Sequence, residues 1–157
     1  MKDNLNNELH IGDYVFCLTG SLKNTIQQIQ KTRTIQETFG TRDGVDFGNG
    51  CWLSDYNTIS LSALGATCTQ VASKPCHDAL GHPLNIGDKV LFLHSMEMFT
   101  EVGVVKKLAP KSCLLDIKEN RFHQTEYRKK YEEIISLTAL GKEDIILDHS
   151  FRQGYEL

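Results

Sequence analysis

Short apolar stretches recur along this chain, and glycine, proline and asparagine separate them. The clearest examples are residues 14–18 and 89–93, each of which follows a Gly-Asp pair. Short apolar runs bounded by turn residues are typical of strands, whereas no long stretch has the 3.6-residue period of a helix. We therefore predict an all-β protein.

Other strands are predicted at residues 51–53, 56–61, 101–108, 112–117 and 134–137. Residues 25–38 are rich in β-branched side chains, which favours one more strand. Four glycines between residues 39 and 50 indicate a run of tight turns. We expect residues 119–133 to form a short helix or a long loop, and residues 1–8 to be loosely held.

Two sequence segments occur twice. Residues 9–18, LHIGDYVFCL, return as LNIGDKVLFL at 84–93, and ISLSALG at 59–65 returns as ISLTALG at 135–141. The offsets, 75 and 76 residues, are nearly equal, so the chain is an internal duplication. About five strands per copy is the size of a small SH3-like barrel. We predict a first barrel at 1–65, a linker at 66–77, a second barrel at 78–141 and a C-terminal extension at 142–157.

The composition excludes several classes of protein. No apolar run approaches the roughly 20 residues of a membrane helix, and the polar N-terminus has no apolar signal core. Five cysteines, an odd number without a regular framework, favour reduced thiols in a cytoplasm. The net charge of −3 argues against a protein that coats nucleic acid with its whole surface.

The distribution of charge is more informative than its sum. Residues 106–130 hold eight bases and three acids, a net of +5, whereas residues 131–157 hold two bases and six acids, a net of −4. Lys and Arg neutralise phosphates, so the basic stretch is the candidate nucleic-acid site. Its predicted contacts, with two bases of the first repeat, are Lys106, Lys107, Lys111, Lys118, Arg121, Arg128, Lys129, Lys130, Lys31 and Arg33. Phe122, Tyr127 and Tyr131, interleaved among these bases, either stack on exposed nucleobases or pack beneath the loop.

The sequence LNIGDKV at 84–90, followed by VGVV at 102–105, resembles the KOW and Tudor group of SH3-like barrels. These domains carry a GD-x-V turn and then G-x-V on the next strand. The first repeat matches through residues 11–15 but has Gln27 in place of the second glycine. The resemblance implies binding to nucleic acid or to transcription and ribosomal machinery. In size and tandem arrangement the chain is also similar to the MotB-type transcription modifiers of T-even bacteriophages, which bind DNA.

Other chemistry fits the residues less well. Cys68, Cys76, His77 and His82 cluster in sequence, but their spacing is not that of a zinc site. No cysteine nucleophile, carboxylate pair or phosphate loop has a recognisable setting, so we expect neither an enzyme nor a cofactor. Asp13 and Asp88 are interpreted as turn formers. Trp52 either anchors the first core or lines a groove.

We therefore predict a non-enzymatic accessory of transcription that binds double-stranded DNA largely independently of sequence, in the cytoplasm of a bacterial host if a phage encodes it. The alternative is a protein-interaction module that holds a host or partner protein through a groove near Trp52 or through the acidic tail.

Overall fold

The computed structural model describes residues 1–94, 99–117 and 126–147, which form β-strands joined by turns and a few short helices. The chain divides into two compact units, and the boundary between Cys68 and Thr69 lies within the predicted linker. The all-β prediction is confirmed. No helix of these described ranges is long and apolar enough to cross a membrane.

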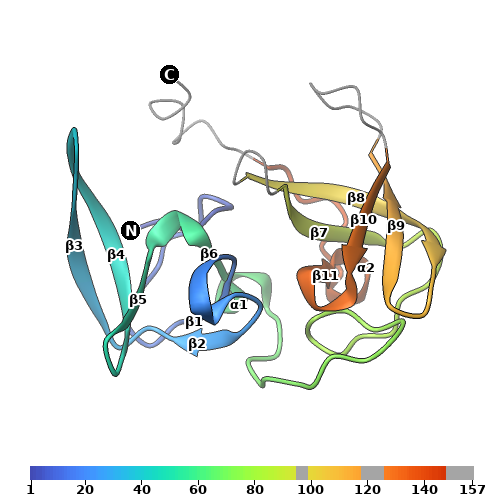
Figure 1. The fold of residues 1–157 in the computed structure, drawn as a ribbon, viewed down its shortest axis with the longest axis horizontal. Helices are drawn as coiled ribbons and strands as arrows, with labels where there is room; N and C mark the ends of the chain where they lie inside the picture. The colour runs from blue at the N-terminus through green and yellow to red at the C-terminus, as the bar shows by residue number, and fades with distance from the viewer. Residues whose placement is uncertain (95–98, 118–125, 148–157) are drawn as a thin grey trace. The chain divides into compact units, whose positions relative to one another are not determined.

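The first unit contains two antiparallel three-stranded sheets (Figure 1). The first has the order β2-β1-β6 and the second the order β3-β4-β5. The strands are β1 (Tyr14–Cys17), β2 (Ile26–Gln28), β3 (Lys31–Glu37), β4 (Gly40–Gly48), β5 (Cys51–Ser54) and β6 (Thr58–Ser60). Short 3-10 turns cover Gly20–Leu22 and Asp55–Asn57, and a one-turn helix, α1 (Leu61–Leu64), follows β6.

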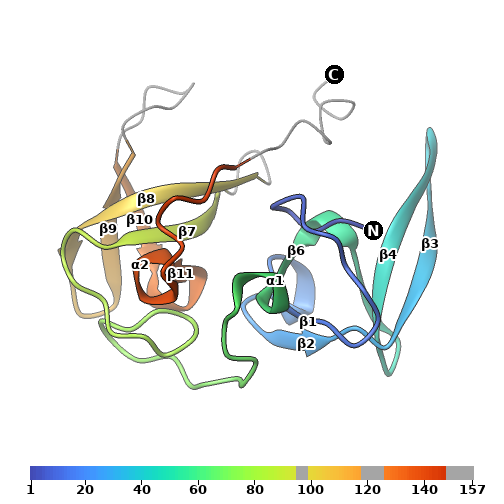
Figure 2. The ribbon, with the colours of Figure 1, turned by 180° about the vertical axis from the view of Figure 1, so that it is seen from behind.

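The second unit has one antiparallel five-stranded sheet in the order β10-β9-β8-β7-β11 (Figure 2). Its strands are β7 (Lys89–His94), β8 (Phe99–Leu108), β9 (Ser112–Asp116), β10 (Glu126–Lys130) and β11 (Ile134–Ser136). A 3-10 turn at Tyr131–Glu133 brings the chain back from β10, and α2 (Leu137–Leu140) follows β11. In both units the described sheets are open.

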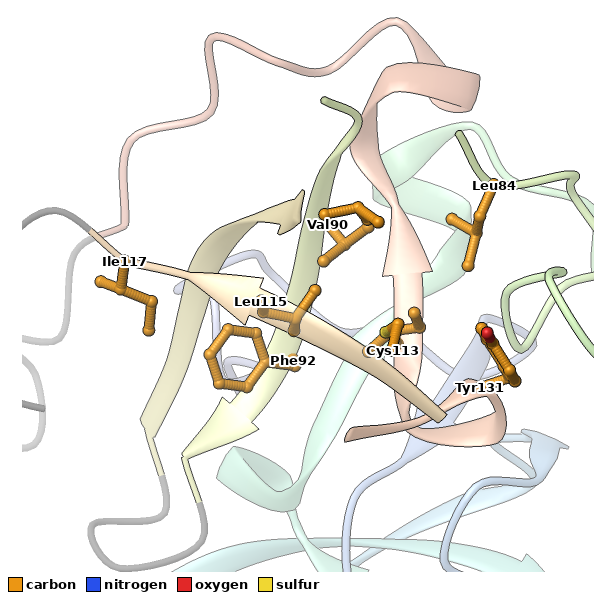
Figure 3. Packing of buried hydrophobic residues seen from close by; sticks show 9 residues of the cluster. Leu84, Val90, Phe92, Cys113, Leu115, Ile117 and Tyr131 are labelled. Carbon is orange, nitrogen blue, oxygen red and sulfur yellow. The ribbon is translucent and has the colours of Figure 1, made fainter. Parts of the chain in front are cut away.

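Each unit buries its own apolar core, because alternate residues of its strands point inward. Figure 3 shows the second core, where Val90 and Phe92 of β7 face Cys113 and Leu115 of β9, and Tyr131 is buried beside them. The first core is formed by Leu9, Val15, Cys17, Ile29, Val45 and Phe47.

Three local predictions were wrong. The glycine-rich stretch after Phe39 is the strand β4, in which a Cβ at Gly44 would lie 2.7 Å from Cδ1 of Ile35, so a larger residue there would displace that side chain. Within 119–133, the described residues form β10 and a 3-10 turn instead of a helix or loop. The N-terminal segment is firmly held, since Asp3 and Asn4 are fully buried.

The repeated Gly-Asp pairs form the same turn in both units, which confirms their interpretation. Gly12 and Gly87 have φ values of 94° and 95°, a conformation that glycine adopts without strain. Oδ2 of Asp13 accepts the backbone N–H of His10 at 2.8 Å, and Oδ2 of Asp88 accepts that of Asn85 at 2.9 Å. The two aspartates therefore stabilise the turns that precede β1 and β7.

A buried carboxylate closes each unit. Oδ1 of Asp3 accepts the backbone N–H groups of Leu5 and Asn7 at 3.0 and 2.7 Å, and Oδ2 accepts that of Ser60, at the end of β6, at 2.7 Å. The carboxylate thus ties the N-terminal segment to the last strand. Burial raises the pKa of Asp3 above its usual 3.8, and these bonds oppose that shift.

Asp78 plays the same part in the second unit. Its Oδ1 accepts the N–H groups of Leu80 and His82 at 3.0 and 2.7 Å, and its Oδ2 accepts that of Ser136 at 2.7 Å. Nδ1 of His82 lies 3.0 Å from Oδ2, where the first unit places Nδ2 of Asn7 at 3.2 Å from Oδ2 of Asp3. The duplication therefore reaches upstream of residues 9 and 84, at least to Asp3 and Asp78.

The strand registers show where the copies differ in length. Lys31 of β3 is equivalent to Lys107 of β8, at an offset of 76 residues. Lys31 pairs with Asp46 of the next strand, β4, and Lys107 pairs with Leu114 of the next strand, β9. Val45 of β4 corresponds to Cys113 of β9, at an offset of only 68. The β3–β4 hairpin is thus eight residues longer than its counterpart. The offset returns to 76 at Leu53 and Lys129, so the second unit has its extra eight residues between β9 and β10.

Replacing either buried carboxylate should destabilise its own unit. We expect Asp3→Asn and Asp78→Asn each to lower the free energy of unfolding by about 2–4 kcal/mol. Both oxygens of the carboxylate accept backbone N–H groups, whereas the amide replaces one oxygen with an NH2 group, which is itself a donor and leaves an N–H group without an acceptor. Urea unfolding followed by Trp52 fluorescence reports the first unit, and hydrogen exchange of β11 reports the second. The exposed Asp144→Asn is the control, and an unchanged midpoint in both variants would contradict the structural role.

Candidate nucleic-acid interface

Five of the predicted bases lie on the solvent-facing side of the sheet formed by β8, β9 and β10, or at its hairpin turn. We call this surface the basic face; it consists of Lys106, Lys107, Lys111, Arg128 and Lys130. All five are exposed. Strands β8, β9 and β10 lie side by side in Figures 1 and 2, so residues far apart in sequence become neighbours there.

Strand alternation explains why these side chains share a face. Lys107 and Arg128 both pair with Leu114, one from each side, so the three form a row across the sheet. Lys130 pairs with Ser112, two residues along β9. The intervening Cys113 is fully buried in the core beneath. The core and the basic face are thus opposite sides of the same strands.

A β-bulge adds Lys106 to this face. The register of β8 moves from Val105 opposite Leu115 to Lys107 opposite Leu114, so Lys106 is the extra residue and both lysines are exposed. Such a bulge redirects a side chain that regular alternation would turn inward. Nζ of Lys106 is hydrogen-bonded to Oε1 of Glu126, which raises the pKa of the lysine.

The remaining bases keep their charge available. Nη1 of Arg128 donates to Oγ of Ser112 at 3.0 Å, which holds the guanidinium along the sheet. Lys107, Lys111 and Lys130 make no ion pair with any residue that the structure describes. Asp116 and Glu126 are the acids of the same side of β9 and β10, so five bases stand against two acids.

Lys129 lies on the opposite side of β10 from Arg128 and Lys130. It is half-buried, and its ammonium group is 5.6 Å from the ring centroid of Phe92 in the core. It is therefore separated from the basic face, although it is adjacent in sequence. Lys118 and Arg121 fall outside the described residues.

The two predicted bases of the first unit have different surroundings. Lys31 of β3, Asp46 of β4 and Trp52 of β5 form the row that corresponds to Lys107, Leu114 and Arg128. The guanidinium of Arg33 lies 4.4 Å from the ring centroid of Trp52 and 3.8 Å from Oδ2 of Asp46. Asp46 thus takes the place of Leu114, and Trp52 takes the place of Arg128.

The aromatic residues of the second unit serve its core. Tyr131 is buried, and its hydroxyl donates to the backbone oxygen of Ala109. The Tyr127 ring lies 5.9 Å from that of Phe92, and its hydroxyl is 3.1 Å from Nε2 of His94. These two residues therefore pack beneath the strands instead of presenting a stacking surface, while Phe122 lies outside the described residues. Trp52, in contrast, is 40% exposed, which does not fit the first of its two interpretations, an anchor of the core.

The cysteine and histidine side chains near the linker have structural neighbours. Sγ of Cys76 lies 3.8 Å from the hydroxyl of Tyr131, Nδ1 of His77 lies 2.9 Å from the oxygen of Pro75, and His82 contacts Asp78. Within the part of the chain that the structure describes, no three His, Cys, Asp or Glu side chains are grouped as metal ligands. All five cysteines are free thiols.

Sequence reasoning identified the basic stretch but not how it divides between two faces. The alternation of exposed and half-buried residues in 126–130 would have separated Lys129 from its neighbours once this segment was interpreted as a strand. The role of Ser112 as the partner of Arg128 depends on the β9–β10 register, and no local sequence signal indicates it.

Comparison with known proteins gives a family match for the second unit. Residues 76–137 match the model of a domain of unknown function, DUF7205. The matched segment begins just before Asp78 and ends just after Ser136, so it contains both ends of the carboxylate bridge in that unit. No curated protein matches the chain.

The buried thiols should be chemically inert in the folded protein. Burial raises the pKa of Cys17 to about 12 and that of Cys113 to about 11, so at pH 8 the thiolate is at most about a thousandth of either residue. We expect iodoacetamide to modify the half-buried Cys51, Cys68 and Cys76 first, as measured by peptide mass spectrometry. In denaturant all five should react, and rapid labelling of Cys17 or Cys113 before unfolding would contradict the burial.

Proposed function

We propose that the chain is a non-enzymatic protein that binds double-stranded DNA through the basic face of its second unit. The observation that carries this proposal is the gathering of five exposed bases, against two acids, on one side of β8–β10. Phosphates in a duplex are closely spaced along each strand, so a surface with several cations neutralises several of them and releases their counterions.

The composition of the face supports binding that does not read sequence. Lysine ammonium groups contact phosphates as point charges, and the Asn and Gln side chains that read adenine edges do not occur among residues 106–117 or 126–130. In the part of this unit that the structure describes, the sheet presents the bases without a projecting helix that could enter the major groove. Contacts with the phosphate backbone are thus the expected mode of recognition.

The topology supports the SH3-like part of the proposal. In the second unit four strands follow one another as a meander, and the fifth returns through a 3-10 turn to pair with the first. This strand order, with the Gly-Asp turn before β7, is compatible with the small SH3-like unit that the resemblance to the KOW and Tudor group implies. On that resemblance we propose two tandem SH3-like units and a role as an accessory of transcription in the cytoplasm, that of a bacterial host if a phage encodes the chain.

A protein-interaction role is the second candidate. It is favoured by two exposed aromatic side chains in the first unit, Phe39 and Trp52. A pull-down from nuclease-treated lysate separates the two proposals, because a partner that binds directly survives removal of the nucleic acid.

Substitutions on β10 provide the sharpest test of the DNA proposal. Arg128→Ala and Lys130→Ala should each weaken binding to any duplex and reduce the slope of log Kd against log salt by about one, the contribution of one phosphate contact. Lys129→Ala, between them but on the other side of the strand, should leave both quantities nearly unchanged. Fluorescence anisotropy with two unrelated duplexes at increasing salt measures these effects.

The same titrations define the contrary outcomes. No binding of the wild-type chain at low salt, or an affinity that does not fall with salt, would exclude the proposal. An effect of Lys129→Ala equal to that of its neighbours would move the contact away from the basic face. Thermal unfolding of each variant shows that the fold is retained.

A further inference from the structure

The outer edge of β3 is an open sheet edge. Among the strands that the structure describes, β3 has β4 as its one neighbour, and it is the outermost strand of the β3–β4–β5 sheet in both views (Figures 1 and 2). Six of its seven residues are exposed, and Ile35 is half-buried. The backbone groups along such an edge can pair with another strand.

Most of the usual protections of an edge strand are missing from β3, and its charged side chains are the one that it keeps. Edges are commonly blunted by a proline, a bulge, a very short strand or a covering element. The sequence KTRTIQE contains no proline, and the β3–β4 register runs without a shift from Lys31 opposite Asp46 to Glu37 opposite Gly40. The strand is therefore seven residues of regular, exposed edge.

The charges of β3 favour one particular neighbour. Its two bases, Lys31 and Arg33, lie in its first half, and its acid, Glu37, is its last residue. A second copy of the strand, placed alongside in the antiparallel direction, brings the acidic end of each to the basic end of the other. A parallel copy in register would instead place like charges side by side, which is unfavourable.

We propose that two copies of this chain associate by antiparallel pairing of β3 with β3, about a two-fold axis at Thr34. In this register Lys31 of each copy is opposite Glu37 of the other, and Thr34 is opposite itself. The two three-stranded sheets become one six-stranded sheet. The interface is isologous, as in most closed dimers.

The alternatives to this register are less favourable. In an antiparallel pair, two residues directly opposite each other either both point their backbone N–H and C=O groups toward the partner strand or both point them away from it. The register can therefore change only in steps that keep this match. One such step places Arg33 opposite Arg33. The other places Arg33 opposite Glu37. In every register Glu37 is also bound to Arg42 of its own chain, with Nε of Arg42 2.6 Å from its Oε1, so the registers differ in the base that approaches it: Arg33 is already held by Asp46 and Trp52. Lys31, in contrast, makes no ion pair with a described residue.

The tip of the hairpin fits this arrangement as well. Phe39 has a relative exposure of 101%, so within the described part of the chain nothing covers it. It lies two residues beyond Glu37, which brings it beside the residues that precede Lys31 in the second copy. The dimer therefore offers this aromatic ring a surface that the single chain lacks.

Complementary charge variants test the proposal in the absence of nucleic acid. Lys31→Glu alone places Glu opposite Glu, and Glu37→Lys alone places Lys opposite Lys, so each should weaken dimerisation by about tenfold or more. An equal mixture of the two variants restores an opposite pair at both positions. Sedimentation velocity over a concentration series should therefore show a wild-type dimer, weaker association of each variant alone, and recovery in the mixture.

Matched substitutions control for charge and for loss of an internal ion pair. Lys142→Glu makes the same charge change at an exposed position of the second unit, and Glu8→Lys, like Glu37→Lys, removes an ion pair within the chain, in this case with Lys2. Both controls should dimerise as the wild type does. A wild-type chain that stays monomeric at several hundred micromolar, or variants whose mixture associates no better than either alone, would overturn the proposal.

Discussion

The structure depends on one interaction, made twice: a buried carboxylate that accepts backbone N–H groups from both ends of its unit. An ionised group without such donors would be costly to bury, so Asp3 and Asp78 are tolerated only because several N–H groups converge on each. The raised pKa of Asp3 reflects that cost. In return the carboxylate fixes the N-terminal segment against the last strand, and the Gly-Asp turn and first strand follow from there.

On this shared frame the two units have diverged in length and charge. The first has the longer hairpin, β3–β4, with an open edge and an exposed aromatic tip. The second has its extra residues between β9 and β10, and its equivalent row holds Lys107 and Arg128 instead of Lys31 and Trp52. The proposed roles follow this division: the second unit contacts phosphate, and the first contacts another copy of the chain.

The sequence predicted the parts of the fold that depend on local chemistry. The Gly-Asp turns and the strands after them could be inferred from the repeat. So could the equivalence of Gln27 and Gly103, which lie opposite Val15 and Val90 respectively. Asp3 and Asp78 lie at the same offset of 75 residues, each with a leucine two residues later, so the repeat could have been extended to them. Their bonds to Ser60 and Ser136 could not be predicted, because those partners are more than fifty residues away. The glycines of β4 were misleading for a related reason: Gly44 lies within the strand, opposite Arg33 and against the side chain of Ile35, and not in a turn.

For the candidate site, the sequence predicted the basic stretch but not its geometry. Within β10 the side chains of Arg128 and Lys130 point to one side of the sheet and that of Lys129 points to the other, and the bulge at Lys106 reverses the alternation in β8.

The hydrogen bond between Asp78 and Ser136 also has a bearing on the ancestry of the fold. Because it holds the two ends of a unit together, a copied unit needs only a short connection to its neighbour, and new termini opened in a hairpin would leave the closure intact. Tandem duplication was therefore an easy step for this fold.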